Sequence, residues 1–500
     1  MKLAVIGLDG LSANMIAQYR DELPVLDRLL SDGASGTLQS TLPPVTLPAW
    51  TTFSTGKDPG RHGMYNMTEI TSEYESSPVS PNTSEGALYD AIDESVFVNL
   101  QGAYGREPRG DALLIPGSAP SVDAALPDEI KLWEEANQYR VKRNADLDPD
   151  PYVEDLISIS EARFDMARRA ADEYDPELLF VLFSSPDWLF HYLGSRGDES
   201  MIAPLMSYLD EVLEWFLENA DNLMIMSDHG FERKHTAAYP NKILENEGLL
   251  STRPPEDSSA SARLTVRLIK QFTKRSDLAH ELVRRTYNRF IHTELAENLY
   301  QAKEEDINFE ETVAWHDGWG VVYLNDDYFA QSTVSDANYE EVRQSVIDTL
   351  SDSTHPDTGE QLFRDVLPGE EVYQGTKGVV PDVVIDPEPG VMLYQSPMQD
   401  KIASKTHIYN HRRAGIYAGI GEAFDGTSLD AEIQDIAPTV LHLLDRPVPK
   451  DMDGIVLTDA LTDNREVERR DSIEPGKVFS HTDEDQEEIR DQLADLGYLE

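Results

Sequence analysis

LAVIGLD, the run from Leu3 to Asp9, is an apolar stretch that ends in a carboxylate. Strands that are buried on both faces of a sheet have this near-continuous hydrophobic pattern. We therefore expect a central strand at the start of the chain, with Asp9 at its carboxyl end. The run is far too short for a signal peptide, so we do not expect a secreted protein.

Short apolar runs bounded by Gly, Asp or Ser recur along the chain between longer helical patterns. The other runs are Leu178 to Phe183, Leu223 to Met226, Val380 to Ile385 and Gly415 to Ile420. The helical patterns, with apolar residues three to four positions apart, include Leu23 to Leu30, Ser158 to Ala171 and Leu205 to Phe216. This alternation predicts an α/β fold with a mostly parallel central sheet and helices on each side.

The length of 500 residues exceeds what one hydrophobic core usually supports, so we expect a catalytic core with a large insertion. From Arg263 to Phe290, eight Lys or Arg against two acids lie on a helical pattern. The stretch is either a solvated helical pair or a contact surface for an anionic substrate or a membrane. We predict a catalytic core at 1–234 and 326–461, an inserted, partly helical cap at 235–325 and an acidic tail at 462–500.

The composition is strongly acidic, with 93 Asp or Glu against 42 Lys or Arg and a formal charge of −51. The acidic surface would repel a polyanion, which excludes a general nucleic-acid-binding surface. An evenly acidic surface also stays hydrated and soluble at high salt, which suits a salt-loving source. There is no cysteine, so any metal ligands must be Asp, Glu, His or a hydroxyl. No stretch approaches the roughly 20 apolar residues of a membrane span, and we expect a cytoplasmic protein.

Three of the predicted strands lead within a few residues into carboxylates: Asp9, Asp187 and Asp228. In open α/β sheets ligands bind beyond the carboxyl ends of the strands. Carboxylates gathered there repel one another unless a cation neutralises them, so we predict a metal site. His191 lies four residues after Asp187, on the same face of a predicted helix, and His229 directly follows Asp228.

A second segment, LPPVTLPAWTTFSTG from Leu42 to Gly56, offers several hydroxyls just before a predicted helix. Pro48 suits the first turn of that helix, which places Thr46 near its amino end, beside backbone N–H groups without helical partners. Thr46 is therefore either a reactive hydroxyl or an N-cap.

These motifs, in this order, resemble the type I phosphodiesterase/nucleotide pyrophosphatase branch of the alkaline phosphatase superfamily. The segment from Pro44 to Gly63 is similar to the nucleophile segment of that branch. The remaining matching positions are Asp9, Asp187 with His191, Asp228-His229-Gly230, His411 in HRRAGI, Asp435 to Leu441, and Asp451 to Gly454. The resemblance implies a three-layer alkaline-phosphatase-like core with an inserted cap.

The resemblance also implies two divalent cations, with Thr46 as the nucleophile. One cation would be held by Asp187, His191 and His411, with His407 as the alternative last ligand. The other would be held by Asp9, Asp228, His229 and the Thr46 hydroxyl. Nitrogen and oxygen ligands suit zinc, which the family favours, and manganese also accepts them.

The implied reaction is hydrolysis of a small-molecule phosphate ester through a covalent phosphothreonine. Arg412 and Arg413 are candidates for binding the phosphate, or for a surface salt bridge. Few cationic side chains accompany the motifs, which favours diesters. A metal-dependent phosphomutase or phosphoryl group transferase using the same intermediate is the alternative, and a metal-stabilised binding protein is a third hypothesis.

Two differences between this chain and related families narrow the range of expected substrates. Nucleotide pyrophosphatases of this resemblance have Asn three residues after the nucleophile, where this chain has Ala49. The superfamily's sulfatases need a Cys or Ser that becomes formylglycine, followed by a Pro and an Arg at fixed spacing, and the run from Thr46 to Trp50 meets neither requirement, so we do not expect a formylglycine sulfatase. Four aromatic residues near the end of the predicted cap, which either choose the leaving group or pack in a core, are Trp315, His316, Trp319 and Tyr323.

Overall fold

The computed structural model describes residues 1–79, 84–119, 121–196, 199–253, 307–396, 399, 401–463, 465–479 and 490. The basic stretch from Arg263 to Phe290 lies outside these residues, as does the predicted tail beyond residue 479, except for residue 490. Within the described part of the chain, no helix has both the length and the apolar character needed to cross a membrane.

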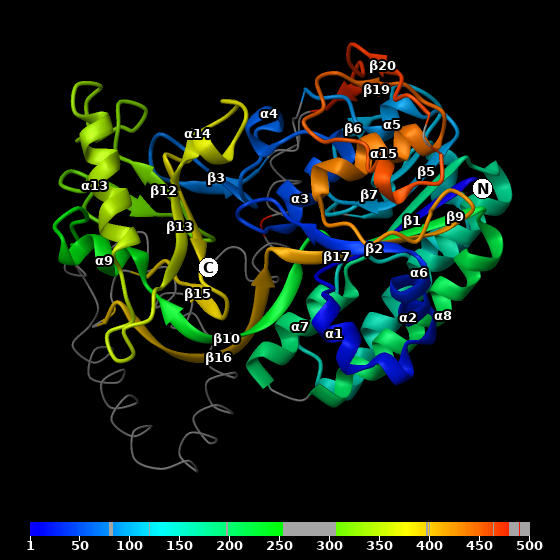
Figure 1. Ribbon diagram of the computed structural model, residues 1–500, viewed down its shortest axis with the longest axis horizontal. Helices are drawn as coiled ribbons and strands as arrows, with labels where there is room; N and C mark the ends of the chain where they lie inside the picture. Colours follow the sequence, from blue (N-terminus) through cyan, green and yellow to red (C-terminus); the bar gives the residue numbers. More distant parts are fainter. Residues whose placement is uncertain are drawn as a thin grey trace.

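An eight-stranded sheet forms the centre of the larger lobe, at the right of Figure 1, in the order β18-β2-β17-β9-β1-β8-β5-β7. Only β17 runs antiparallel to its neighbours. The strands are β1 (Leu3–Leu8), β2 (Ala34–Gln39), β5 (Ser95–Leu100), β7 (Leu113–Pro116), β8 (Leu178–Phe183), β9 (Asn222–Met226), β17 (Ala414–Gly421) and β18 (Ala431–Glu432). The predicted mostly parallel sheet is confirmed.

Helices cover both faces of this sheet and give the larger lobe three layers (Figure 1). Alternate residues of β1 point to opposite layers, Ile6 into one core cluster and Val5 into the other. One layer holds α1 (Ala13–Gln18), α2 (Pro24–Asp32), α6 (Pro149–Tyr174), α7 (Ser185–Arg196) and α8 (Ile202–Asn219). The other holds α3 (Thr46–Thr55), α5 (Leu88–Ala91) and α15 (Ile436–Leu443). The three-layer α/β prediction is therefore confirmed.

A second, smaller lobe lies at the left of Figure 1 and contains two further sheets. One has the order β15-β10-β16, from β15 (Val391–Leu393), β10 (Gly230–Ala238) and β16 (Ala403–Arg412). The other has the order β11-β12-β14-β13, from β11 (Ala314–His316), β12 (Val321–Leu324), β13 (Phe363–Pro368) and β14 (Val383–Pro387). The helices of this lobe are α9 (Pro240–Asn246), α13 (Tyr339–Ser351) and α14 (Gly369–Val372).

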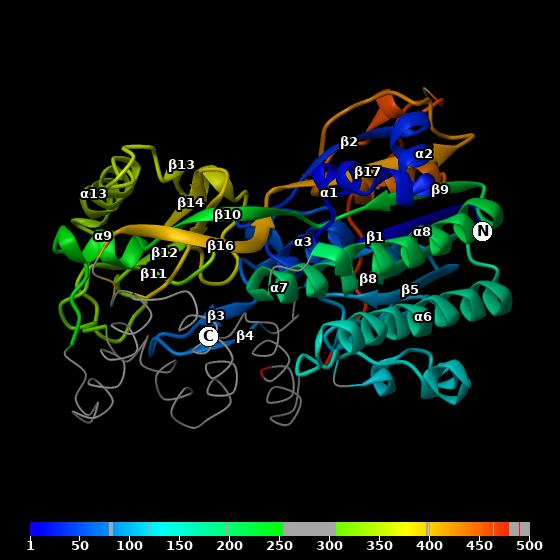
Figure 2. The ribbon, with the colours of Figure 1, turned by 90° about the horizontal axis from the view of Figure 1, so that it is seen from below.

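Strands β10 and β16 connect the two lobes. They form a long antiparallel pair that extends beyond the carboxyl end of β9 and runs into the second lobe, as Figures 1 and 2 both show. Residues 383–387 form β14 of the second lobe, so the expectation that Val380 to Ile385 belongs to the central sheet is wrong. The apolar pattern of a buried strand is the same in either sheet, which is why the pattern could not assign it. The domain boundary at residue 325 stays a prediction, although elements on both sides of it share this lobe.

Short elements complete the two lobes. A hairpin of β3 (Thr68–Ile70) and β4 (Ser76–Pro78) follows α4 (Pro59–His62). Two further pairs join distant segments: β6 (Arg106–Glu107) with β21 (Lys477–Val478), and β19 (Val448–Pro449) with β20 (Arg469–Arg470).

Candidate metal centre

The three predicted carboxylates meet at one edge of the central sheet. Strands β9, β1 and β8 are neighbours in the sheet and run parallel, so their carboxyl ends lie side by side. Asp9 directly follows β1, Asp228 closely follows β9, and Asp187 lies in the first turn of α7, just after β8. All three side chains are buried. The sheet order therefore converts three separate strand ends into one cluster.

Thr46 is the first residue of α3, which begins at the same edge of the sheet. The N-cap residue is Val45, so Thr46 does not occupy the N-cap position that the sequence left open. Its Oγ1 lies 3.3 Å from His229 Nε2. One turn further along α3, the Trp50 indole N–H approaches Asp9 Oδ2 at 3.4 Å. The predicted nucleophile is thus beside the predicted ligands.

His411 reaches the cluster through the pairing of β16 with β10, which sets it opposite Phe231. Its Nδ1 lies 2.9 Å from the Pro44 carbonyl oxygen, which can only accept a hydrogen bond. A neutral His411 that donates from Nδ1 therefore presents the lone pair of Nε2 to the cluster. That Nε2 lies 3.2 Å from Asp187 Oδ1 and 2.9 Å from His191 Nε2.

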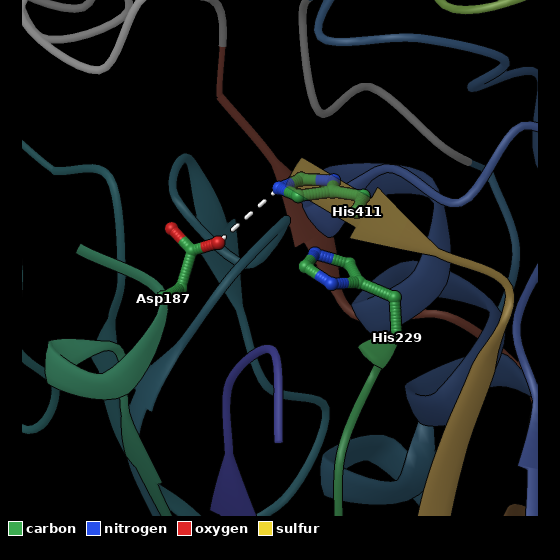
Figure 3. A group of neighbouring side chains, drawn as sticks. All are labelled: Asp187, His229 and His411. Atoms are coloured by element: carbon green, nitrogen blue, oxygen red, sulfur yellow. Dashed lines mark ion pairs between the residues drawn. The ribbon is translucent and has the colours of Figure 1, made fainter. Parts of the chain in front are cut away.

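Asp187, His191 and His411, the first predicted ligand set, come together closely. The third contact of the triangle, between His191 Nε2 and Asp187 Oδ1, is 3.4 Å. The Asp187 carboxylate points towards His411, while His229 lies alongside (Figure 3). His229 also offers a ligand atom within 4.8 Å of those of Asp187 and His411. The structure therefore permits a cation at Asp187 and His411 with either His191 or His229 beside them.

The second predicted set, formed by Asp9, Asp228 and His229, is also compact, with ligand atoms within 4.8 Å of one another. His229 Nε2 lies 3.2 Å from Asp228 Oδ2 and 3.8 Å from Asp9 Oδ1. The other oxygen of Asp228 accepts the Gly10 N–H at 3.2 Å, which orients the carboxylate. The rings of His229 and His411 stack with centroids 3.7 Å apart, so the two sets adjoin.

Each of the three carboxylates keeps one buried oxygen without a hydrogen-bond partner: Asp9 Oδ1, Asp187 Oδ1 and Asp228 Oδ2. Buried polar atoms are normally paired, and a buried anionic oxygen is costly when it is not. These are the same oxygens that face the imidazole nitrogens. Divalent cations would satisfy both groups of acceptor atoms, so the residues fit a metal centre.

Electrostatics support this conclusion. Burial, followed by the nearby Asp228 and Asp187, raises the pKa of Asp9 well above its usual value. Burial, then Asp187, raises the pKa of Asp228 to about 8. Burial alone would raise the pKa of Asp187 as well, but His191 and His411 lower it well below its ordinary range. Burial also lowers the pKa values of His229 and His411, which favours the neutral imidazoles that bind metals.

Other predicted site residues lie in different surroundings. His407 is exposed on β16 and belongs to neither ligand group. Arg412 lies near Glu232 and Lys234 of β10. Arg413 donates from Nε to the Ser40 carbonyl at 3.0 Å. A contact of either arginine with a substrate phosphate stays a prediction.

The four cap aromatics divide into two kinds. Trp315 and Tyr323 are buried in the core of the second lobe, and His316 is fully buried. Trp319 is half-buried, and its indole lies 4.8 Å, centroid to centroid, from the His411 ring. The glycines on each side of Trp319 are a signal in the sequence that could have singled it out. The sequence-based reasoning also missed the contact of Trp50 with Asp9, because it depends on how α3 packs.

Comparisons with known proteins identify the family of this chain. Residues 3–415 match the family model "Type I phosphodiesterase / nucleotide pyrophosphatase". A comparison with curated protein sequences finds no match.

Two solved structures share the fold at low sequence identity. Human ectonucleotide pyrophosphatase / phosphodiesterase 5 (ENPP5, NPP5) is 14% identical, with a TM-score of 0.50, over 93% of this chain and 100% of that one. Phosphonoacetate hydrolase from Sinorhizobium meliloti 1021, in complex with phosphonoformate, is 16% identical, with a TM-score of 0.52, over 86% of this chain and 90% of that one. The family match over most of the chain shows that this protein belongs to the type I phosphodiesterase/nucleotide pyrophosphatase family and is a phosphoric ester hydrolase.

Proposed function

We propose that this chain hydrolyses phosphodiesters through a covalent phosphothreonine on Thr46, beside two divalent cations. The observation that carries the proposal is the position of His229. Its Nε2 lies 3.3 Å from Thr46 Oγ1 and 3.2 Å from Asp228 Oδ2, while its ring stacks on His411. The Thr46 hydroxyl therefore lies beside His229, which offers a ligand atom to both groups.

Two ligand sets would hold the cations. Asp187, His191 and His411 form one, and Asp9, Asp228, His229 and the Thr46 hydroxyl form the other. When bound, such a pair of cations lowers the pKa of a coordinated hydroxyl and stabilises the charge on the attacking and leaving oxygens of an in-line displacement. Oxygen and nitrogen donors without sulfur suit zinc, and manganese is the other candidate.

The chain's own residues prepare the nucleophile. Thr46 begins α3, a helix of 10 residues whose amino end carries partial positive charge that favours a phosphate. The side chains of Val45 and Leu47, on each side of Thr46, pack in a small apolar cluster. Packing on both sides of Thr46 therefore holds its Oγ1 beside His229 Nε2.

The reaction takes place in two displacements. Thr46 Oγ1 loses its proton and forms a bond to phosphorus, while the bond from phosphorus to the leaving oxygen breaks and that oxygen takes up a proton to leave as the alcohol. Water then attacks the same phosphorus from the side that the alcohol vacated. The Oγ1–phosphorus bond breaks, Thr46 Oγ1 takes up a proton in exchange for the one that the water loses, and the phosphate monoester product leaves with net retention at phosphorus.

The preference for diesters rests on charge. A monoester carries more negative charge than a diester and needs more cationic contacts. Lys57, the lysine of the nucleophile segment, is instead paired with Glu85 at 2.5 Å and with Asp451 at 2.6 Å. Arg413 donates to a backbone carbonyl. The salt-rich environment expected from the formal charge of −51 accompanies this proposal, as does the separate expectation of a cytoplasmic location.

The nucleophile is tested by comparing Thr46→Ala with Thr46→Ser. We expect the alanine variant to lose turnover of bis(4-nitrophenyl) phosphate by about 10³-fold or more, because no covalent intermediate can form. The serine variant keeps a hydroxyl and should retain measurable activity. Acid quenching of the wild-type reaction should trap phosphate on Thr46, identified by mass spectrometry. Full activity in Thr46→Ala would contradict the mechanism.

The reaction class is tested with a substrate panel in high salt with zinc or manganese. Aryl phosphodiesters should react faster than aryl phosphomonoesters, and an aryl sulfate should react least. Adding an alcohol acceptor separates hydrolysis from group transfer. If the phosphoryl group passes mainly to the alcohol and not to water, the protein is a transferase or mutase.

A further inference from the structure

Trp319 occupies an unusual backbone position in the second lobe. It lies in the turn between β11 and β12, where Gly318, Trp319 and Gly320 all have positive φ angles of 82°, 52° and 104°. Glycine adopts this region readily, but a bulky residue rarely does. Strained backbone of this kind persists only where surrounding contacts impose it, and it gathers at ligand-binding sites.

Neighbouring groups hold this turn in place. The backbone N–H of Val321 donates to the Gly318 carbonyl at 3.1 Å, and that of Gly320 donates to His316 Nε2 at 3.1 Å. Burial lowers the pKa of His316 to about 3, so its ring is neutral and can accept this bond. A Cβ at position 320 would lie 2.6 Å from the Ile385 carbonyl oxygen, so only glycine fits there.

The held turn directs the indole towards the metal centre. Its ring centroid lies 4.8 Å from that of His411, with an interplanar angle of 36°. It also packs against the apolar cluster that contains Val45 and Leu47, the two neighbours of Thr46. Trp319 is half-buried, whereas Trp315 on the same hairpin is buried in the lobe's core.

We propose that Trp319 is a specificity-determining residue that contacts a planar, apolar substituent of the phosphate ester. This inference rests on the proposed function, since it names the substrate class of the same site. An indole beside the nucleophile offers a flat apolar surface that a phenyl-sized group can pack against and a methyl group cannot. The strained backbone of Trp319, which lies in the left-handed region, therefore serves to place the indole where it contacts the substrate.

The test measures binding, so that it does not depend on turnover. The Thr46→Ala protein, loaded with zinc or manganese, is titrated with phenyl phosphate and with methyl phosphate by calorimetry. We expect phenyl phosphate to bind about tenfold more tightly than methyl phosphate. Adding Trp319→Ala should bring this ratio close to one, whereas Trp319→Phe should keep most of the preference.

A matched control is Trp215, another half-buried tryptophan, which packs against Phe164 in the larger lobe. Adding Trp215→Ala should leave the ratio of the two affinities unchanged. The bound metal of every variant is measured in parallel. A His316→Gln variant, which keeps Trp319 but alters the support of the turn, should reduce the phenyl preference in part.

Three results would overturn the inference. The first is a phenyl-to-methyl ratio near one in the parent protein. The second is a ratio that survives Trp319→Ala. The third is an equal loss of both affinities together with a loss of metal, which would make Trp319 a support for His411 only. If the affinity ratio behaves as expected but wild-type protein hydrolyses no phosphodiester, the proposed function fails while the binding inference stands.

Discussion

The two lobes contribute to the metal centre in different ways. The larger lobe supplies Asp9, Asp187 and Asp228 from the ends of three adjacent parallel strands, so each ligand lies close in sequence to the strand that positions it. His411 lies near the carboxyl end of β16, one of the two strands that connect the lobes. The second lobe supplies Trp319 from the turn between β11 and β12. These side chains depend on contacts between distant segments.

The two regions therefore have different roles at the site. Each carboxylate is positioned by the strand that precedes it, and the parallel pairing of β1 with β8 and β9 gathers the three charges where a cation can neutralise them. The β10–β16 pair and the second lobe complete the ligand set and shape the space beside the nucleophile. We therefore expect changes at the sheet edge to abolish chemistry, and changes in the second lobe to alter it by smaller amounts.

The largest expected effect comes from Asp228→Asn at the sheet edge. Loss of one carboxylate from the second ligand set should lower kcat/KM for an aryl phosphodiester by about 10³-fold and lower the bound metal. The melting temperature of the metal-free protein should hold or rise, because repulsion among buried carboxylates decreases. Asp172→Asn, on the exposed surface of α6, is the control and should change neither property. Wild-type activity in Asp228→Asn would remove the sheet edge from the mechanism.

A smaller effect is expected for His411→Ala, compared with His407→Ala on the same strand. His411 is buried and contacts Asp187, whereas His407 is exposed. Because Asp187 and His191 would still hold the cation, we expect kcat/KM to fall by about 10²-fold in His411→Ala. His407→Ala should stay within about twofold of wild type, as surface changes usually do. Equal losses in the two variants would contradict the assignment of the last ligand.

Asp58, at the junction between the two lobes, should make the stability of the folded protein depend on pH. It is buried, and its Oδ1 accepts backbone N–H groups from Gly60 of the larger lobe and Gln374 of the second. Burial raises its pKa from 3.8 to about 6. The folded protein therefore binds the proton more tightly than the unfolded chain. The resulting stability is full below about pH 4 and is lost as the pH rises through about 6.

The measurement is urea unfolding of wild type and Asp58→Asn between pH 4 and pH 7. Asn keeps the acceptor oxygen and is a good N-cap for α4, so only the titration should disappear. The stability of wild type relative to the variant should fall by roughly 2 kcal/mol across this range. Parallel curves for the two proteins would show that the pKa of Asp58 is not raised.

The smallest expected effect is that of Tyr373→Phe, also at the junction. The buried Tyr373 hydroxyl donates to the Leu42 carbonyl at 2.9 Å, which ties the second lobe to the segment before the nucleophile. Losing this bond should cost about 1 kcal/mol in the free energy of unfolding. Tyr328→Phe, at an exposed tyrosine of the same lobe, is the control. If the two variants lose equal stability, the Tyr373 contact contributes nothing specific.

Much of the larger lobe could be predicted because its pattern is local. The runs Leu3 to Leu8 and Leu178 to Phe183 match β1 and β8 residue for residue, since both strands are buried on both faces. By contrast β2, with the sequence ASGTLQ, was not predicted, because it is only partly buried and has few large apolar residues. Val380 to Ile385 was predicted as a strand but placed in the wrong sheet.

The sequence by itself determined which carboxylates end strands, which histidines stand near them and which threonine begins a helix, because these features depend on residues close together in the chain. Tertiary structure alone decided that His411 lies opposite Phe231, that His229 adjoins both ligand sets and that Trp319 faces His411 while Trp315 is buried. Those arrangements arise from pairing and packing between segments far apart in sequence. Hydrophobic periodicity reports whether a side chain is buried, but it carries no information about its partner.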